Sequence, residues 1–265
     1  MHVSSVLERR TRPKPTADNC ARFGGACGAF AYRGALDGVD SNLVVLLHGL
    51  GDTAAPFASL GTSLQNALPQ TVVLCLQGTR RVPFLEEDAW MWWDSFTPLG
   101  EPIAQPDPRA GIAVVQQWLA YLCAPEEEHG CCWPPERIHL LGFAQGGTLA
   151  LETAIVERQH LQLGSIVSVQ GPLLSLPTFY PALASPVCFV TRFSRNVVTS
   201  AERQQLAWLY KAYAHVTHHN IASQTDMHER MLQGPEWADI MRFWSPLWCN
   251  RSRMELDGQV YTVHP

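Results

Sequence analysis

Strand-length apolar runs alternate with amphipathic helical segments through most of this chain, and few folds accommodate that order. Runs that are apolar without alternation indicate strands buried on both faces. We predict strands at residues 43–47, 71–76, 137–141, 164–169, 187–191 and 216–222. We predict helices at residues 56–68, 107–122, 148–157 and 199–213, and a last one after residues 234–235. The expected fold class is therefore α/β, a mostly parallel sheet with helices on both faces.

Local end signals support two of these helices. Asp107 followed by Pro108 predicts an N-cap and a proline at the first helical position. Thr199 with Glu202 three residues later predicts a capping box. The helix that starts near Asp107 also has apolar residues at helical spacing, which predict its buried face: Ile112, Val115, Leu119 and Leu122.

Composition excludes several classes of protein. Of the 265 residues, 46% are hydrophobic and 16% are charged, which suits a sizeable core and argues against disorder. The net charge of -5 does not suggest nucleic acid as a partner. The chain has no apolar run of about 18 residues, so we expect no membrane span.

The eight cysteines form no recognisable framework. Cys131 and Cys132 are adjacent, and no Cys-x-x-Cys pair occurs. We therefore expect free thiols in a reducing compartment. We expect no metal site, because no paired ligands occur at a usable spacing.

The first residues are basic and lack an apolar h-region, so we expect no secretory signal. An arginine-rich start leaves a mitochondrial targeting segment open beside the alternative of a frayed terminus. No linker divides the rest of the chain. We predict a cytoplasmic protein with a basic, flexible segment over 1–27, a single domain over 28–248 and a C-terminal tail over 249–265.

The turn after the strand at 137–141 reads Gly142-Phe143-Ala144-Gln145-Gly146-Gly147. Such a glycine-flanked turn between strand and helix is the pattern of a nucleophile elbow, whose sharp bend presents an attacking side chain at its centre. The glycines suit that geometry. The central residue, Ala144, has only a methyl group and cannot attack a carbonyl carbon.

A second loop follows the strand at 43–47 and reads His48-Gly49-Leu50-Gly51-Asp52. The carboxyl ends of parallel strands meet at one edge of a sheet, so the two loops should lie together. The backbone N–H groups of Leu50 and Gln145 would then form an oxyanion hole. His48 itself is either a structural histidine that bonds neighbouring loops or a base, and we favour the structural role.

These two loops, together with Trp92-Trp93-Asp94, resemble the acyl-protein thioesterase and carboxylesterase branch of the α/β-hydrolases. The resemblance covers roughly residues 43 to 247. It implies the α/β-hydrolase fold and hydrolysis of acyl thioesters or carboxylic esters by a Ser-His-Asp triad. It also implies that neither a metal nor an organic cofactor takes part.

The resemblance carries over to the triad only in part. The nucleophile position holds Ala144. Alignment of the Val-Val run at 197–198 puts Arg195 at the position of the acid, and arginine cannot serve as one. His228 lies where the triad histidine is expected. Asp226 or Glu229 could orient His228 instead, although both share its short loop.

Three explanations for Ala144 are open: a laboratory substitution, a natural pseudoenzyme, or different chemistry by an unrecognised nucleophile. Loss of a triad nucleophile lowers turnover by about 10⁶-fold, roughly 8 kcal/mol of barrier. We favour a catalytically impaired member that acts as a binding or interaction protein and keeps an acyl-sized cleft. The alternatives are an active carboxylic ester or thioester hydrolase and an engineered inactive variant.

Aromatic residues near the elbow have two interpretations. Trp92, Trp93 and Phe143 are candidates for the wall of a groove that binds an acyl ester or acyl thioester. Core packing is the other interpretation, and it is the one that we favour. An exposed aromatic cluster could also contact a protein partner. A metal site at His218 and His219 is disfavoured, because strand alternation puts the two rings on opposite faces.

Overall fold

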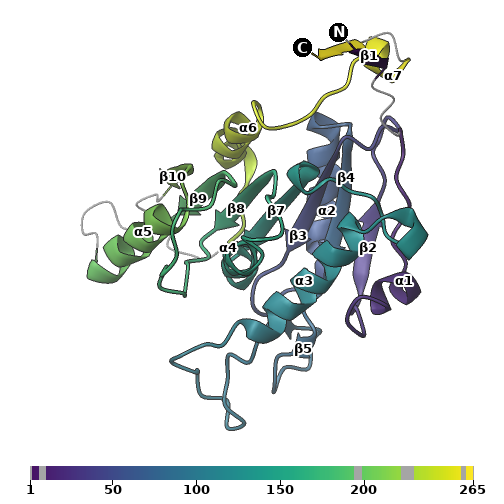
Figure 1. Cartoon of the computed structure of the whole chain (residues 1–265). Helices are drawn as coiled ribbons and strands as arrows, with labels where there is room; N and C mark the ends of the chain where they lie inside the picture. The colour runs from purple at the N-terminus through teal and green to yellow at the C-terminus, as the bar shows by residue number, and fades with distance from the viewer. Residues whose placement is uncertain (1, 6–9, 194–198, 222–229, 258–260, 265) are drawn as a thin grey trace.

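The computed structural model describes residues 2–5, 10–193, 199–221, 230–257 and 261–264. Its centre is a seven-stranded sheet with the strand order β10-β9-β8-β7-β3-β4-β2 (Figure 1). The strands are β2 (Phe30–Arg33), β3 (Asn42–Leu47), β4 (Thr71–Leu76), β7 (Ile138–Phe143), β8 (Ser165–Val169), β9 (Val187–Thr191) and β10 (Val216–Asn220). All neighbours pair in parallel except β2, which runs antiparallel to β4.

The predicted strands are all present, with ends that shift by one or two residues. Strand β2 was not predicted, because it lies at the edge of the sheet. Its side chains are half-buried or exposed, so it lacks the continuous apolar run by which the central strands are recognised. The β10 strand ends at Asn220, and residue 222 lies outside the described part of the chain.

Helices cover both faces of the sheet, as predicted (Figure 1). Successive residues of β3 point to opposite sides: Leu43, Val45 and Leu47 join one core cluster, and Val44 and Leu46 join the other. The first cluster includes residues of α1, α3, α4 and α5, and the second includes residues of α2 and α6. Their bounds are α1 (Ala17–Ala21), α2 (Ala54–Ala67), α3 (Arg109–Cys123), α4 (Gln145–Val156), α5 (Ser200–Ala212) and α6 (Ala238–Trp244).

The predicted helix signals are mostly confirmed. Thr199 and Glu202 form the capping box of α5, and the four apolar residues predicted for the inner face of α3 are buried. The predicted cap at Asp107 is wrong, because α3 begins at Arg109 with Pro108 in the N-cap position. Asp107 instead accepts hydrogen bonds from the backbone and guanidinium of Arg109.

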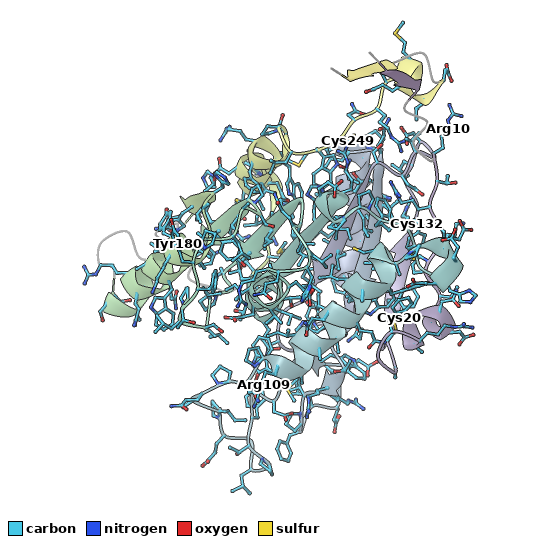
Figure 2. All side chains as sticks on the ribbon, in the orientation of Figure 1. Arg10, Cys20, Arg109, Cys132, Tyr180 and Cys249 are labelled. Carbon is cyan, nitrogen blue, oxygen red and sulfur yellow. A yellow bond between two sulfur atoms is a disulfide. The ribbon has the colours of Figure 1, made fainter. Side chains whose placement is uncertain are left out.

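A disulfide joins Cys20 of α1 to Cys27, so the expectation that all cysteines are free is wrong for this pair. Their Cα atoms are 6.1 Å apart, within the range that a disulfide spans. The helix and the turn after it bring the two residues together, a result of local folding that their spacing did not indicate. Figure 2 labels Cys20 on this helix.

The remaining elements are short. The strand β1 (His2–Ser5) pairs antiparallel with β11 (Tyr261–His264), so the two chain ends lie side by side (Figure 1). The hairpin of β5 (Arg80–Arg81) and β6 (Trp90–Met91) forms a third sheet. The others are η1 (Glu126–Glu128), η2 (Pro135–Arg137), η3 (Gly234–Trp237) and α7 (Arg253–Leu256). None of the helices in the described ranges is long and apolar enough to cross a membrane.

Residues after α6 return to the start of the central strands. The Asn42 side chain donates to Cys249 O and accepts from Cys249 N–H. Gln70 makes the same exchange with the backbone of Arg251. The segment expected as an extended tail is thus bonded to the sheet at residues 249 and 251, and it contains α7. The domain boundary at residue 249 stays a prediction.

Candidate functional site

The turn between β7 and α4 has a strained residue at its centre. Ala144 is the one residue between the two elements, with φ 47° and ψ −114°. A positive φ is uncommon for a residue with a Cβ atom. Backbone hydrogen bonds hold it: Ala144 N–H donates to Val169 O at 2.8 Å, and Ala144 O accepts from Thr148 N–H at 3.0 Å. The half-buried methyl group therefore lies at a fixed corner on the carboxyl edge of the sheet.

The flanking glycines allow this corner to form. A Cβ atom on Gly142 would lie 2.1 Å from the carbonyl carbon of Gly146, and one on Gly146 would lie 2.2 Å from Leu47 O. A Cβ atom on Gly147 would lie 2.5 Å from the Ser168 hydroxyl. The end of β7, the start of α4 and the end of β3 approach too closely for larger residues, and glycine permits that approach.

The loop after β3 lies against the corner, as the sequence predicted. A Cβ atom on Gly49 would lie 2.8 Å from Phe143 Cδ1 and 3.6 Å from the Ala144 methyl group. Within the described ranges, no acceptor bonds the Leu50 N–H. Gln145 is the first residue of α4, so its N–H has no acceptor within the helix. Two backbone donors are thus near the corner, and their role as an oxyanion hole stays a prediction.

His48 holds this loop in place. Its fully buried ring contacts Gly49 O through Nδ1 at 2.7 Å and accepts from Gly78 N–H through Nε2 at 2.8 Å. Burial lowers the pKa of His48, which keeps the imidazole neutral. Both ring nitrogens are engaged by backbone groups. The arrangement agrees with the structural role favoured from the sequence and leaves no nitrogen free to act as a base.

The tryptophan segment is joined to the corner through Gln145. Trp92 N–H donates to Gln145 Oε1 at 3.0 Å, and Gln145 Nε2 donates to the Ser95 hydroxyl at 2.6 Å. The Trp92 indole N–H donates to His48 O at 2.9 Å. Trp92 is fully buried and Trp93 is 4% exposed, so both pack in the core. A contact of either tryptophan, or of the half-buried Phe143, with a substrate stays a prediction.

The other residues predicted for the triad are not among those that the structure describes. They are Arg195, Asp226, His228 and Glu229. Their predicted roles stay predictions. The two histidines considered as metal ligands are described, and they point to opposite sides of β10: His218 stacks on Phe189, and His219 contacts Asp239 of α6.

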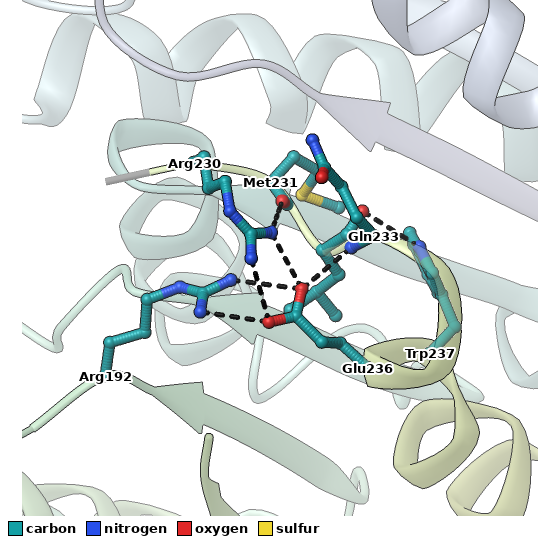
Figure 3. A network of polar contacts seen from close by, with 7 residues as sticks. Arg192, Arg230, Met231, Gln233, Glu236 and Trp237 are labelled. Carbon is teal, nitrogen blue, oxygen red and sulfur yellow. Dashed lines mark hydrogen bonds and ion pairs between the residues drawn. The ribbon is translucent and has the colours of Figure 1, made fainter. Parts of the chain in front are cut away.

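An ion-pair network joins Arg192, Arg230 and Glu236 (Figure 3). Arg192, directly after β9, places its two terminal nitrogens 3.0 and 3.2 Å from the carboxylate oxygens of Glu236. Arg230 bonds the same carboxylate at 2.8 and 3.1 Å, and Gln233 N–H donates to it at 2.8 Å. The network joins the end of β9 to η3 and the residues before it.

The network is largely buried, and it keeps the Glu236 carboxylate ionised. The Arg192 side chain is 4% exposed and that of Glu236 is 22% exposed. Burial alone would raise the pKa of Glu236, but hydrogen bonds from Arg230, Arg192 and the Gln233 N–H, with the charge of Arg192, lower it to about 2. These contacts were not predicted, because Arg192 and Glu236 are 44 positions apart and no local sequence pattern relates them.

The sheet order, the strained corner and the loop beside it define a protein with the α/β-hydrolase fold. The chain belongs to the phospholipase/carboxylesterase family, whose model matches residues 37–234. It is 40% identical over 230 residues to an uncharacterized hydrolase of Mycosarcoma maydis, a match that covers 85% of this chain and 84% of that one.

Other relatives are more distant. An uncharacterized hydrolase of Schizosaccharomyces pombe is 29% identical over 192 residues, which cover 70% of this chain and 76% of that one. Among solved structures, Zea mays acyl-protein thioesterase 2 has a TM-score of 0.62 at 17% identity, with 83% of this chain and 99% of that chain covered. At this identity the likeness concerns the fold alone.

Proposed function

We propose that this chain is a catalytically impaired member of the phospholipase/carboxylesterase family that binds an acyl ester or acyl thioester. The observation that carries the proposal is the half-buried methyl group of Ala144 at a corner with φ 47°. In this family pattern the corner holds the nucleophile. A methyl group has no lone pair to attack with, whatever surrounds it.

Physical arguments support retained binding with little turnover. Without the nucleophile, an oxyanion hole and a pocket alone leave about 10³ to 10⁴-fold catalysis over water. The Arg195 predicted at the acid position would add little further loss, because the triad residues act as a unit. The backbone donors of Leu50 and Gln145 need no triad to bind a carbonyl oxygen, so a ligand's acyl group still has partners.

An activity assay tests the impairment directly. The purified chain is incubated with a chromogenic short-chain ester, and separately with a fluorophosphonate probe that labels activated serines. We expect neither turnover above background nor labelling. Robust turnover that disappears when one side chain near the corner is changed would overturn the impairment and reveal another nucleophile.

A binding assay tests the ligand class. A fluorescent long-chain acyl ester is titrated onto the chain, and we expect saturable binding. Leu50→Glu places a carboxylate beside the predicted oxyanion position and should weaken binding about tenfold, a change of about 1.4 kcal/mol. Leu36→Glu is the matched control: Leu36 is 46% exposed against 41% for Leu50, and it lies at the opposite edge of the sheet. Equal losses in the two variants would contradict a site at the corner.

A further inference from the structure

We propose that two adjacent loop tips on this protein form a docking surface for a positively charged, amphipathic segment of a protein partner. The surface is named here the tip patch and consists of Phe84, Leu85 and Leu99. Their side chains are 75%, 50% and 85% exposed, respectively. The inference concerns a partner protein and does not depend on the acyl ligand proposed above.

The two tips belong to the excursion between β4 and α3, which projects beyond the sheet (Figure 1). The first tip closes the hairpin of β5 and β6, where Val82 N–H donates to Ala89 O at 2.8 Å. The second is a turn in which Thr97 N–H donates to Glu101 O at 2.8 Å. Figure 2 labels Arg109, where this excursion enters α3.

The two tips pack on a shared small core, so the turns that carry the tip patch support each other. Val82, Ala89 and Met91 are buried together, and Phe96 from the second tip packs against them. The ring of Phe84 reaches the second tip as well: a Cβ atom on Gly100 would lie 3.4 Å from its Cε2 atom. The three exposed apolar side chains are therefore carried on adjoining, mutually supported turns.

The backbone conformation of Phe84 is unusual and supports a binding role for its exposed ring. Phe84 has φ 64°, a conformation uncommon for a bulky residue. Strained backbone concentrates at ligand-contacting and switch regions, so such an outlier motivates a functional hypothesis. An aromatic ring held 75% exposed in this way is suited to anchor a partner, since aromatic residues dominate the binding energy of many interfaces.

The charged residues around the tip patch indicate which kind of partner it would bind. Arg80 pairs with Asp94, and Arg81 pairs with Asp88. Three exposed carboxylates remain without an ion-pair partner in the described part of the chain: Glu86, Glu87 and Glu101. An apolar centre with an acidic rim complements a segment that has apolar residues flanked by lysine or arginine. The same rim would repel a second copy of this chain and an anionic lipid surface.

The test uses the full chain and defined probes. A fluorescent synthetic peptide of leucine and lysine, patterned as an amphipathic helix, is titrated by anisotropy at low and high salt. The same pattern with glutamate in place of lysine is the charge-inverted probe. We expect saturable binding of the lysine peptide that weakens with salt, and binding of the glutamate peptide at least about tenfold weaker.

Variants locate the binding. Phe84→Asn with Leu99→Ser should weaken the lysine peptide about tenfold or more, and asparagine is chosen because it tolerates positive φ. The control variant, Leu176→Ser with Tyr180→Ser, removes two apolar side chains outside the tip patch. These two residues are 55% and 95% exposed. Figure 2 labels Tyr180 far from Arg109. Thermal melting verifies that every variant is folded.

Four outcomes would overturn the proposal. They are no binding of the lysine peptide, equal losses in the tip-patch and control variants, binding of anionic lipid vesicles that depends on the tip patch, and a dimer that depends on it. Binding of the peptide with no binding of the acyl ester would support this inference and count against the proposed function alone.

Discussion

At the scale of single residues, Ala144 and its predicted triad partners give the sharpest prediction. Ala144→Ser alone should restore little ester hydrolysis, because Arg195, the residue predicted at the acid position, cannot orient a histidine. Ala144→Ser with Arg195→Asp should restore more, if His228 occupies the triad position. Initial rates with a chromogenic ester compare the two variants. Equal, high activity in both would mean that the acid comes from elsewhere in the chain.

His139 gives a second prediction at this scale. Its ring is fully buried, with Nδ1 2.8 Å from the Ser165 hydroxyl, and it stacks on Trp248. Burial, helped by the charge of Arg137, lowers the pKa of His139 to about 3. In the unfolded chain the pKa of histidine is about 6.5, so only the unfolded state gains a proton as the pH falls below that value. The free energy of unfolding must therefore fall between pH 6.5 and about 3.

The measurement compares denaturant unfolding of the parent chain and His139→Asn at several pH values. Each pH unit below 6.5 should lower the stability of the parent by up to about 1.4 kcal/mol relative to the variant, which cannot titrate there. Between pH 7 and 4.5 the difference in stability should change by about 2 to 3 kcal/mol. Parallel stability curves would show that His139 titrates normally.

At the scale of elements, Glu236 fastens the end of β9 to η3. Glu236→Gln leaves the buried guanidinium of Arg192 without its carboxylate, so the free energy of unfolding should fall by about 2 to 3 kcal/mol at pH 7. The pKa of Glu236 is lowered to about 2, so this contribution is complete above the unfolded value near 4.5 and is lost as the pH falls toward 2.

The control for this prediction is Asp94→Asn. Asp94 also receives two hydrogen bonds from one arginine, Arg80, but both side chains are about half exposed. An exposed pair contributes about 1 kcal/mol or less. Chemical denaturation of both variants should therefore separate them clearly, and equal losses would mean that burial adds nothing to the Glu236 network.

At the scale of the whole molecule, the chain after α6 closes onto the amino ends of β3 and β4. Removal of residues 249–265 would leave the side chains of Asn42 and Gln70, both buried, without these backbone partners. Unpaired buried polar groups cost about 1 to 3 kcal/mol each. We expect the truncated chain to melt several degrees lower. Asn42→Ala should lower the melting temperature less in the truncated chain than in the full chain, because its Cys249 partners are already absent. An unchanged melting temperature would show that the tail adds no stability.

Much of the fold could be predicted because its signals are local. Apolar runs of strand length identified the central strands, and Thr199 with Glu202 marked the start of α5. The glycines at 142 and 146 indicated a tight corner at Ala144, since only glycine permits so close an approach of strand and helix. Each of these inferences depends on residues within a few positions of one another, where sequence spacing translates directly into geometry.

The features that the sequence pattern did not predict depend on contacts between distant parts of the chain. The carboxylate of Glu236 meets Arg192 across 44 residues, and Asn42 meets Cys249 across 207. The edge strand β2 is recognisable only once β4 is beside it. Periodicity and capping report local backbone preference, whereas such pairings depend on how the whole sheet is ordered. Spacing along the chain has no direct relation to distance in space once the topology brings remote segments together.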